Sequence, residues 1–433
     1  MLRASESRPV ARAPPDLRIA LRPICETEAA VTTLVSARKW ERRETALLGQ
    51  VAAAHFVSHF HIMTLPALIP LLPAHLGVSF IELGLALTAF NLVSLVVQTP
   101  LGFLTDWLGP RRMLIAGLMV GGASFTLLAL THAYVFLIAA MMSAGLANGV
   151  YHPADYAILS SGIRGEKMGR AFSIHTFAGF LGGAVAPAIL LAAATLGGVP
   201  MAFAISACLA FVVALVLVAT PGADRERDEG GASAKVSKIQ ATDLRGLVTP
   251  AVLSLMMLYI LLSLSTSGIN NFSVTALTTG FNVTLPVANT ALTGFLLASS
   301  IGVLAGGVLA DRTRRHGIVA ALALLLAAGM VSLIVLLDLP PFAMVATLTV
   351  AGFLGGIIAP SRDMLVRAAA PKGAEGRVFG IVSTGFNIAG LFGPMMYAYL
   401  LDRGLPRAIF IATVIFMLVT MMITLAQELR ARG

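Results

Sequence analysis

The sequence predicts an all-α membrane protein in which twelve transmembrane helices form two pseudo-symmetric six-helix bundles. Three observations predict this class: the apolar composition, the number of apolar stretches and an internal repeat. Of the 433 residues, 57% are hydrophobic and only 12% are charged, against about 25% charged in an average soluble domain. A soluble protein of this length could not bury so much apolar surface, whereas a bilayer covers it with helices of about 20 apolar residues each.

Twelve stretches of the chain are long and apolar enough to cross a bilayer. Isolated polar residues do not interrupt them, because the backbone groups of a helix are paired within the helix. The stretches begin near Ala46, Phe80, Met113, Tyr134, Met168, Val199, Pro250, Pro286, Gly317, Pro341, Gly376 and Pro406.

The two halves of the chain repeat the same Gly, Pro and Asp residues in the same order, and Arg170 of the first half returns as Arg377. At a spacing of 207 residues, Gly145, Gly149, Pro153, Gly183 and Pro187 return as Gly352, Gly356, Pro360, Gly390 and Pro394. At a spacing of 205 residues, the segment from Gly102 to Asp106 returns as Gly307 to Asp311. Two homologous halves in an apolar chain are typical of a secondary transporter, whose site lies between the repeats.

Lys and Arg residues define the expected orientation, because they collect in cytoplasmic loops. They occur in alternate connections, among them those with Arg111, Arg164 and Arg315, while the opposite connections are nearly free of them except for Arg403 and Arg407. Both termini are therefore expected in the cytoplasm. The net charge of +9 is the sum of this bias and predicts no nucleic-acid partner.

The expected domain organisation follows from composition. Residues 1–45 are predicted to be a disordered cytoplasmic tail, 46–220 the first bundle, 221–248 a polar cytoplasmic linker, 249–427 the second bundle and 428–433 a short cytoplasmic tail. The two cysteines, Cys25 and Cys208, match neither a disulfide nor a metal-site pattern. No nucleophile–base pair is visible, so neither an enzyme nor a cofactor is expected.

The segment from Gly102 to Arg112 resembles the cytoplasmic loop motif of the major facilitator superfamily, and the segment from Gly307 to Arg315 is a second copy. Trp107 and Pro110 depart from the basic residues usual in that motif. The resemblance implies two rocking halves in a bacterial cytoplasmic membrane, in a monomer that carries a small molecule. Ala54-His55-Phe56 and Gly149-Val150-Tyr151-His152-Pro153 resemble the fosmidomycin-resistance exporters, although His59 stands where those exporters have an Asp.

Four histidines are the candidates for proton coupling, because titratable groups at membrane depth are costly and histidine titrates near neutral pH. His55, His152 and His175 are expected at one depth on three helices, and His59 lies one turn beyond His55. The alternative is that each ring only hydrogen-bonds a neighbouring helix. His55 and His59 have the spacing of two metal ligands, but without a third ligand or an acidic neighbour in register no metal site is expected.

The repeat places Asp155 opposite Arg362, which predicts an ion pair between the halves when the cytoplasmic end is closed. The loop motifs add Gly102, Asp106, Arg111 and Asp311 as gating candidates. The alternative is local pairing, of Asp155 with Arg111 and of Arg362 with Asp363, because a buried charge needs some partner.

Amides complete the set of candidate substrate contacts, although amides also join helices in membranes. The candidates are Asn91, Gln98, Asn270, Asn271 and Asn387. The function predicted from all these residues is proton-coupled efflux of a small polar or anionic molecule by alternating access. The alternatives are a proton-coupled importer of an organic anion, for which Arg362 is suited, and a membrane sensor that transports nothing.

Overall fold

Long helices make up the computed structural model, which describes residues 40–164, 167–220, 249–313, 315–369 and 375–430. The first half contains α2 (Arg42–Leu68), α3 (Leu72–Leu76), α4 (Phe80–Leu108), α5 (Pro110–Leu130), α6 (Tyr134–Gly162) and α7 (Met168–Ala219). The second half contains α9 (Pro250–Gly280), α10 (Leu285–Arg312), α11 (His316–Leu336), α12 (Pro341–Ala369), α13 (Glu375–Asp402) and α14 (Pro406–Arg430). Of the tail expected to be disordered, 1–45, residues 1–39 lie outside the described residues, as does the whole of the expected linker, 221–248.

Helix α7 contains two of the predicted membrane crossings. Its 52 residues would reach about 78 Å at 1.5 Å per residue, more than twice the thickness of a bilayer core. The helical geometry breaks at Gly197 and at Gly198, whose φ of 76° favours glycine. Ten described helices satisfy the length and hydropathy of a membrane span, with α7 taken as one. When the two parts of α7 are counted separately, one span is added. Helix α13, which the repeat pairs with the first part of α7, adds another. The total is the twelve predicted spans, which confirms the fold class.

Helix α2 begins at Arg42, four residues before the expected start at Ala46. Glu41 and Glu44 form a capping box at its first turn. Glu44 is buried and accepts hydrogen bonds from Lys167 at 2.8 Å and from Arg164 at 3.0 Å. The apolar stretch in the sequence begins only after these charged residues, so the start of the helix was predicted too late.

The sequence repeat corresponds to the same close helix packing in both halves. A Cβ on Gly145 of α6 would lie 2.4 Å from the carbonyl oxygen of Phe90 on α4. A Cβ on Gly352 of α12 would lie 2.1 Å from the carbonyl oxygen of Phe295 on α10. Phe295 follows Phe90 at the repeat spacing of 205 residues. Glycine at the two equivalent positions therefore allows the two equivalent helix pairs to touch through their backbones.

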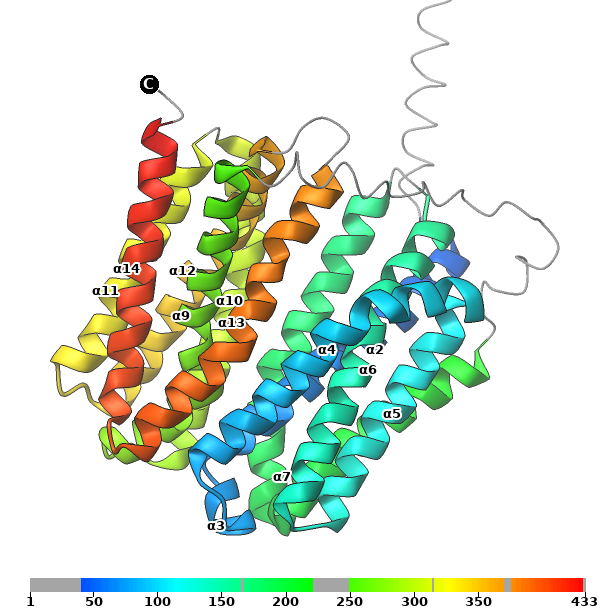
Figure 1. Cartoon of the computed structure of the whole chain (residues 1–433), viewed down its shortest axis with the longest axis horizontal. Coiled ribbons are helices and arrows are strands. Elements are labelled where there is room, and N and C mark those ends of the chain that lie inside the picture. The colour runs from blue at the N-terminus through cyan, green and yellow to red at the C-terminus, as the bar shows by residue number, and fades with distance from the viewer. Residues whose placement is uncertain (1–39, 165–166, 221–248, 314, 370–374, 431–433) are drawn as a thin grey trace, which may run out of the picture.

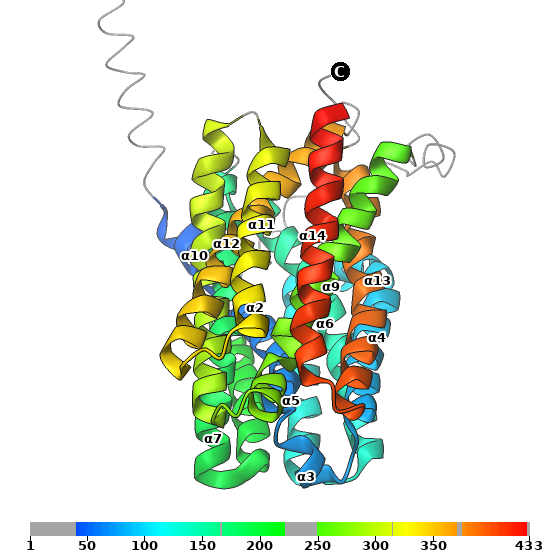
Figure 2. The same ribbon diagram turned by 90° about the vertical axis from the view of Figure 1, so that its left-hand side faces the viewer.

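The two halves meet where α4 and α13 run side by side, at the end of the molecule that carries α3 (Figures 1 and 2). The backbone N–H groups of Phe80 and Ile81 donate to the carboxylate of Asp402 at 3.0 and 2.8 Å. Further along the same contact, the Thr88 hydroxyl donates to the carbonyl oxygen of Leu391 at 3.1 Å. Asp402 of the second half therefore caps the first turn of a helix of the first half.

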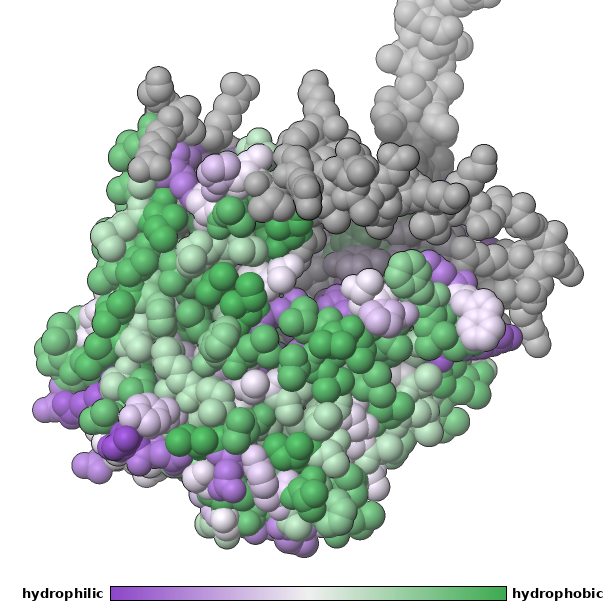
Figure 3. Space-filling view, viewed as in Figure 1, coloured by the Kyte–Doolittle hydropathy of each residue, from purple (hydrophilic) through white to green (hydrophobic). Residues whose placement is uncertain are grey.

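A cavity of about 310 Å³ separates the halves nearer the opposite end. It lies between the first part of α7 and the helices α10 and α12, and Phe172, Thr176, Ser300 and Pro360 are among its lining residues. Apolar side chains cover most of the lateral surface seen in Figure 3, as expected for a surface that faces lipid. The halves are thus joined at the α3 end and enclose a cavity towards the end that carries the C-terminus.

Asp402→Ala should weaken the contact between the halves, because two N–H groups of α4 lose their acceptor. Loss of a helix cap costs about 0.5–2 kcal/mol, so the population with this contact open should rise by roughly two- to thirtyfold. The measurement is the maleimide labelling rate of Thr88→Cys in purified protein whose two native cysteines are replaced by serine. Asp338→Ala, which removes an exposed carboxylate elsewhere, is the control. Equal labelling rates in both variants would rule out a closing role for Asp402.

Candidate functional site

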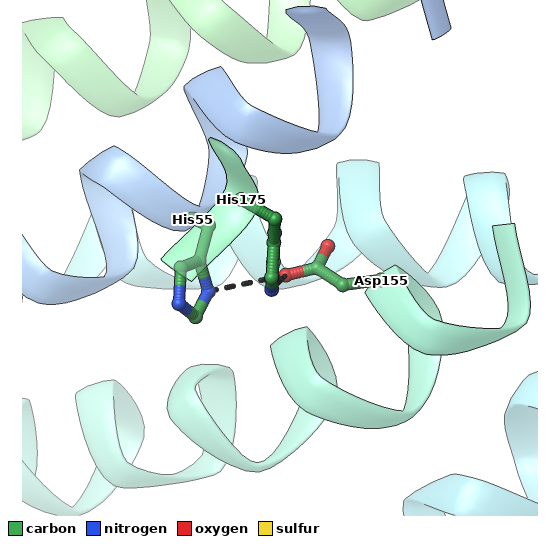
Figure 4. A group of neighbouring side chains, drawn as sticks. All are labelled: His55, Asp155 and His175. Carbon is green, nitrogen blue, oxygen red and sulfur yellow. Dashed lines mark ion pairs between the residues drawn. The ribbon is translucent and has the colours of Figure 1, made fainter. Parts of the chain in front are cut away.

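Asp155 on α6 lies at the centre of a buried group of titratable side chains (Figure 4). Its side chain has no solvent exposure, and Oδ2 lies 3.3 Å from Nδ1 of His55 on α2. The same oxygen lies 3.7 Å from Nε2 of His175 on α7. Three helices of the first half therefore each supply one ionisable side chain to a single point inside the bundle.

The structure brings together all four histidines that the sequence singles out. The ring of His55 lies 3.8 Å from that of His175, 4.7 Å from that of His59 and 5.5 Å from that of His152, measured between centroids. His59 and His152 are half-buried, whereas His55 and His175 are buried. We call these four histidines and Asp155 the histidine cluster.

Small residues on α7 make room for the histidine cluster. A Cβ on Gly179 would lie 2.4 Å from Cδ2 of His55, and a Cβ on Gly182 would lie 2.1 Å from the carbonyl oxygen of Phe56. Only glycine permits α2 and α7 to approach this closely. The approach sets the rotation of both helices and directs His55 and His175 towards the same carboxylate.

Several polar atoms of the cluster are buried without hydrogen bonds. Within the described part of the chain, Nδ1 of His55, both carboxylate oxygens of Asp155 and both ring nitrogens of His175 lack a hydrogen-bond partner. Their short contacts are therefore electrostatic contacts without hydrogen-bond geometry. His61 contrasts with them, because its Nε2 lies 3.0 Å from the carbonyl oxygen of Ser206. The structural alternative, a ring that only joins helices, describes His61 better than it describes the cluster.

This arrangement can hold and release a proton. A carboxylate buried alone is strongly unfavourable, whereas a carboxylate beside an imidazolium, or a carboxylic acid beside a neutral imidazole, carries no net charge. The ligand atoms of His55, Asp155 and His175 also lie within 4.8 Å of one another, as in a metal site. Asp155 is thus an acidic neighbour of His55 that was not expected from the sequence, and the expectation of no metal site stays a prediction.

Arg362 on α12 lies in the other half and contacts its neighbour Asp363. Its Nε and Nη2 lie 2.9 and 2.8 Å from Oδ1 of Asp363, and Asp155 is paired with the histidines as described. The sequence offered two local pairings as alternatives to a contact between the halves. The structure contains one of them, the pair of Arg362 with Asp363. The contact between Asp155 and Arg362 was expected for a closed cytoplasmic end, and for that state it stays a prediction.

Arg111 ties the end of α7 to α2. Its guanidinium donates to Oε1 of Gln50 at 3.0 Å and to the carbonyl oxygens of Leu217 and Thr220. It thereby satisfies carbonyl groups at the C-terminal end of α7 that have no partner within the helix. In this structure Arg111 contacts the helix end and not Asp155.

The remaining gating candidates lie at the same end of the helices. Asp106 is exposed in the last turn of α4. Gly102 packs beside α6, because a Cβ on it would be 4.0 Å from Cβ of Pro153. Asp311 belongs to α10, but its side chain lies outside the described structure.

The amide candidates are half-buried and lie on several helices. Asn91 donates to the carbonyl oxygen of Leu87 at 2.8 Å, and Asn271 donates to the Ser267 hydroxyl at 3.0 Å. These bonds stay within one helix, so the two residues do not act as hydrogen-bonded links between helices. The buried Oδ1 of Asn270 has no hydrogen-bond partner among the described residues. Gln98 and Asn387 are half-buried on α4 and α13.

Aromatic residues beside both charged groups were missed by the sequence argument. The ring of Tyr156 lies 6.1 Å from those of His152 and His175 and 5.2 Å from that of Phe172. In the other half, the rings of Tyr259 and Phe386 lie 4.4 and 5.1 Å from the guanidinium carbon of Arg362. In an apolar chain, aromatic residues give no signal that separates a binding site from lipid contact.

Comparison with known proteins agrees with the fold and the repeat. The family model for the Major Facilitator Superfamily matches residues 51–269 and 255–431. The chain is 24% identical over 281 residues to the fosmidomycin resistance protein of Escherichia coli strain K12, which covers 64% of this chain and 68% of that protein. It is 27% identical over 270 residues to the uncharacterized MFS-type transporter YfnC of Bacillus subtilis strain 168, covering 60% of this chain and 64% of the relative.

Among solved structures, the fold is similar to that of a bacterial homolog of the human lysosomal transporter Spinster in an inward-facing conformation. The TM-score is 0.75 at 12% sequence identity, and the match covers 90% of this chain and 98% of the other. At this identity the similarity concerns the fold alone. The match of the family model to both halves shows that this chain belongs to the Major Facilitator Superfamily, a family of transporters and not of enzymes.

Proposed function

We propose that this protein exports a small polar or anionic molecule in exchange for protons, by alternating access between its two halves. The observation that carries the proposal is the position of Asp155, fully buried with one oxygen 3.3 Å from His55 and 3.7 Å from His175. Such a group of titratable side chains at membrane depth is costly and is a functional candidate by default.

Charge balance suggests how the histidine cluster could couple the two fluxes. When a proton leaves the cluster, Asp155 and its neighbours carry a net negative charge that is unfavourable in an apolar interior. Closing the bundle around that charge is therefore harder than closing it around the protonated, neutral cluster. Proton binding would thus favour the conformational change in one direction, which is what exchange requires.

The direction of transport is inferred from similarity. The fosmidomycin resistance protein is a relative, and the short segments around His55 and His152 resemble that type of exporter. The arrangement of Lys and Arg further supports a location in a bacterial cytoplasmic membrane with both termini in the cytoplasm. We also propose that the protein works as a monomer, because each six-helix half has its partner within the same chain.

Replacing Asp155 with Asn or His55 with Gln should abolish the dependence of transport on a pH gradient. Each change removes one proton-binding group while keeping a similar volume, and we expect a loss of roughly tenfold or more, equivalent to about 1.4 kcal/mol. His132→Gln, which changes an exposed histidine outside the cluster, is the matched control. If the variants fold and transport retains its pH dependence, the cluster has no coupling role. If the variants fail to fold, its role is structural.

Everted membrane vesicles with an acidic interior should test the direction of transport. If the protein exports in exchange for protons, adding fosmidomycin should dissipate the pH gradient only in vesicles that contain the protein. Cells that express the protein should also tolerate more fosmidomycin than cells that carry Asp155→Asn. An unchanged gradient, together with unchanged tolerance, would contradict export of this compound.

Import of an organic anion is the second candidate, and Arg362 is the observation that favours it, because a guanidinium binds carboxylate or phosphonate groups well. In this case protons and the anion would enter together. Intact cells would then accumulate a labelled anion when the medium is acidified, and expression of the protein would increase their sensitivity to fosmidomycin. The two candidates therefore predict changes of opposite sign in the same susceptibility assay.

A further inference from the structure

The second half contains an arginine that is held between two aromatic rings. The guanidinium carbon of Arg362 lies 4.4 Å from the ring centroid of Tyr259 on α9 and 5.1 Å from that of Phe386 on α13. Arg362 is 14% exposed. Rings at this distance from a guanidinium attract it and fix its plane, so its position is set before any ligand arrives.

The counter-ion of this arginine is its immediate neighbour in the chain. Nε and Nη2 of Arg362 both contact Oδ1 of Asp363, and the Tyr259 hydroxyl donates to the same oxygen at 2.8 Å. Three donors thus converge on one oxygen atom. The Asp363 side chain is 42% exposed, so its carboxylate is bound by the arginine but is also open to solvent and able to move away.

Arg362 with its two rings belongs to the second half, and the histidine cluster belongs to the first half. Tyr156, whose ring is near those of His152 and His175, follows Asp155 directly in the chain. The cavity between the halves is lined by Phe172, which packs against Tyr156, and by Pro360, two residues before Arg362. The cavity is therefore lined by residues that neighbour both groups, Phe172 through its packing against Tyr156 and Pro360 through its position in the chain.

We propose that Arg362, Tyr259 and Phe386 bind the anionic group of the transported molecule, and that Asp363 is an internal counter-ion which the substrate displaces. This inference rests on the proposed transport function and names its substrate class: a small organic anion with a carboxylate or phosphonate next to an apolar or flat group. The guanidinium binds the anionic oxygens, and the rings contact the apolar part. Without substrate, Asp363 keeps the arginine neutralised, so that the empty protein does not close around an unpaired charge.

Displacement of Asp363 makes a specific prediction, because the competing carboxylate can be removed. Asp363→Asn should bind benzoate and benzylphosphonate more tightly than the unmodified protein, by roughly fivefold, as expected for loss of a partly exposed ion pair. Arg362→Gln should lose this binding, and Arg362→Lys should weaken it, because an ammonium lacks the planar fork and stacks less well. Arg367→Gln, which removes an exposed arginine one turn further along α12, should bind as before.

The measurement is the shift in thermal unfolding midpoint of the purified protein as each probe is titrated, since a ligand stabilises the state that it binds. The neutral analogue benzamide is the control for the anionic charge. The expected result is a shift with both anions, none with benzamide, a lower half-saturating concentration for Asp363→Asn and no shift for Arg362→Gln. The gain in Asp363→Asn cannot be caused by misfolding, which could only weaken binding.

Three outcomes would overturn the inference: equal shifts in Arg362→Gln and the unmodified protein, equal shifts with benzamide and benzoate, or no shift with either anion in Asp363→Asn. Failure here is distinguishable from failure of the proposed function. The vesicle assay can still show proton exchange with fosmidomycin if the substrate binds elsewhere. Conversely, Asp155→Asn should still bind the anions even though it has lost proton coupling.

Discussion

The cost of burying one carboxylate determines the organisation of this transporter. Asp155 has no solvent exposure, lies at membrane depth and has no hydrogen bond within the described residues. Its charge can be balanced only by a proton or by the imidazoles beside it. Gly179 and Gly182, which bring α7 against α2, place those imidazoles within reach. In our proposal, the protonation state of the first half is thereby linked to the packing of three helices.

The two halves contain different ionisable groups. The first half holds a titratable cluster, and the second half holds Arg362, which is already neutralised by Asp363. Asp363 neutralises Arg362, and a bound proton would leave the histidine cluster without net charge, so that in our proposal both halves can close without an unbalanced charge. The contact of Asp402 with α4 joins the halves at the opposite end. The sequence predicts a second contact between the halves, the pair of Asp155 and Arg362, when the cytoplasmic end is closed.

The length of the apolar stretches predicted the helices. The rise per residue along each helix then predicted the depth of the histidines. The sequence did not predict that Asp155 belongs with the histidines. Which way a side chain points around the helix axis depends on packing between α2, α6 and α7, and residues such as Phe56 and Gly182 that set this packing are far apart in the sequence. Arg362 had two possible partners, and only the geometry of α12 shows it with Asp363 in this conformation. The early start of α2 was missed because Glu44 is buried by pairing with Lys167.

The central claim is that Asp155 and the histidines exchange a proton. The most direct measurement is infrared difference spectroscopy of the protein in lipid across a pH titration, with Asp155→Asn and His55→Gln as references. Our account predicts a titrating signal from a carboxylic acid or an imidazole, and predicts that Asp155→Asn abolishes it and that His55→Gln shifts it. A spectrum without any titrating signal that depends on these residues would contradict the account.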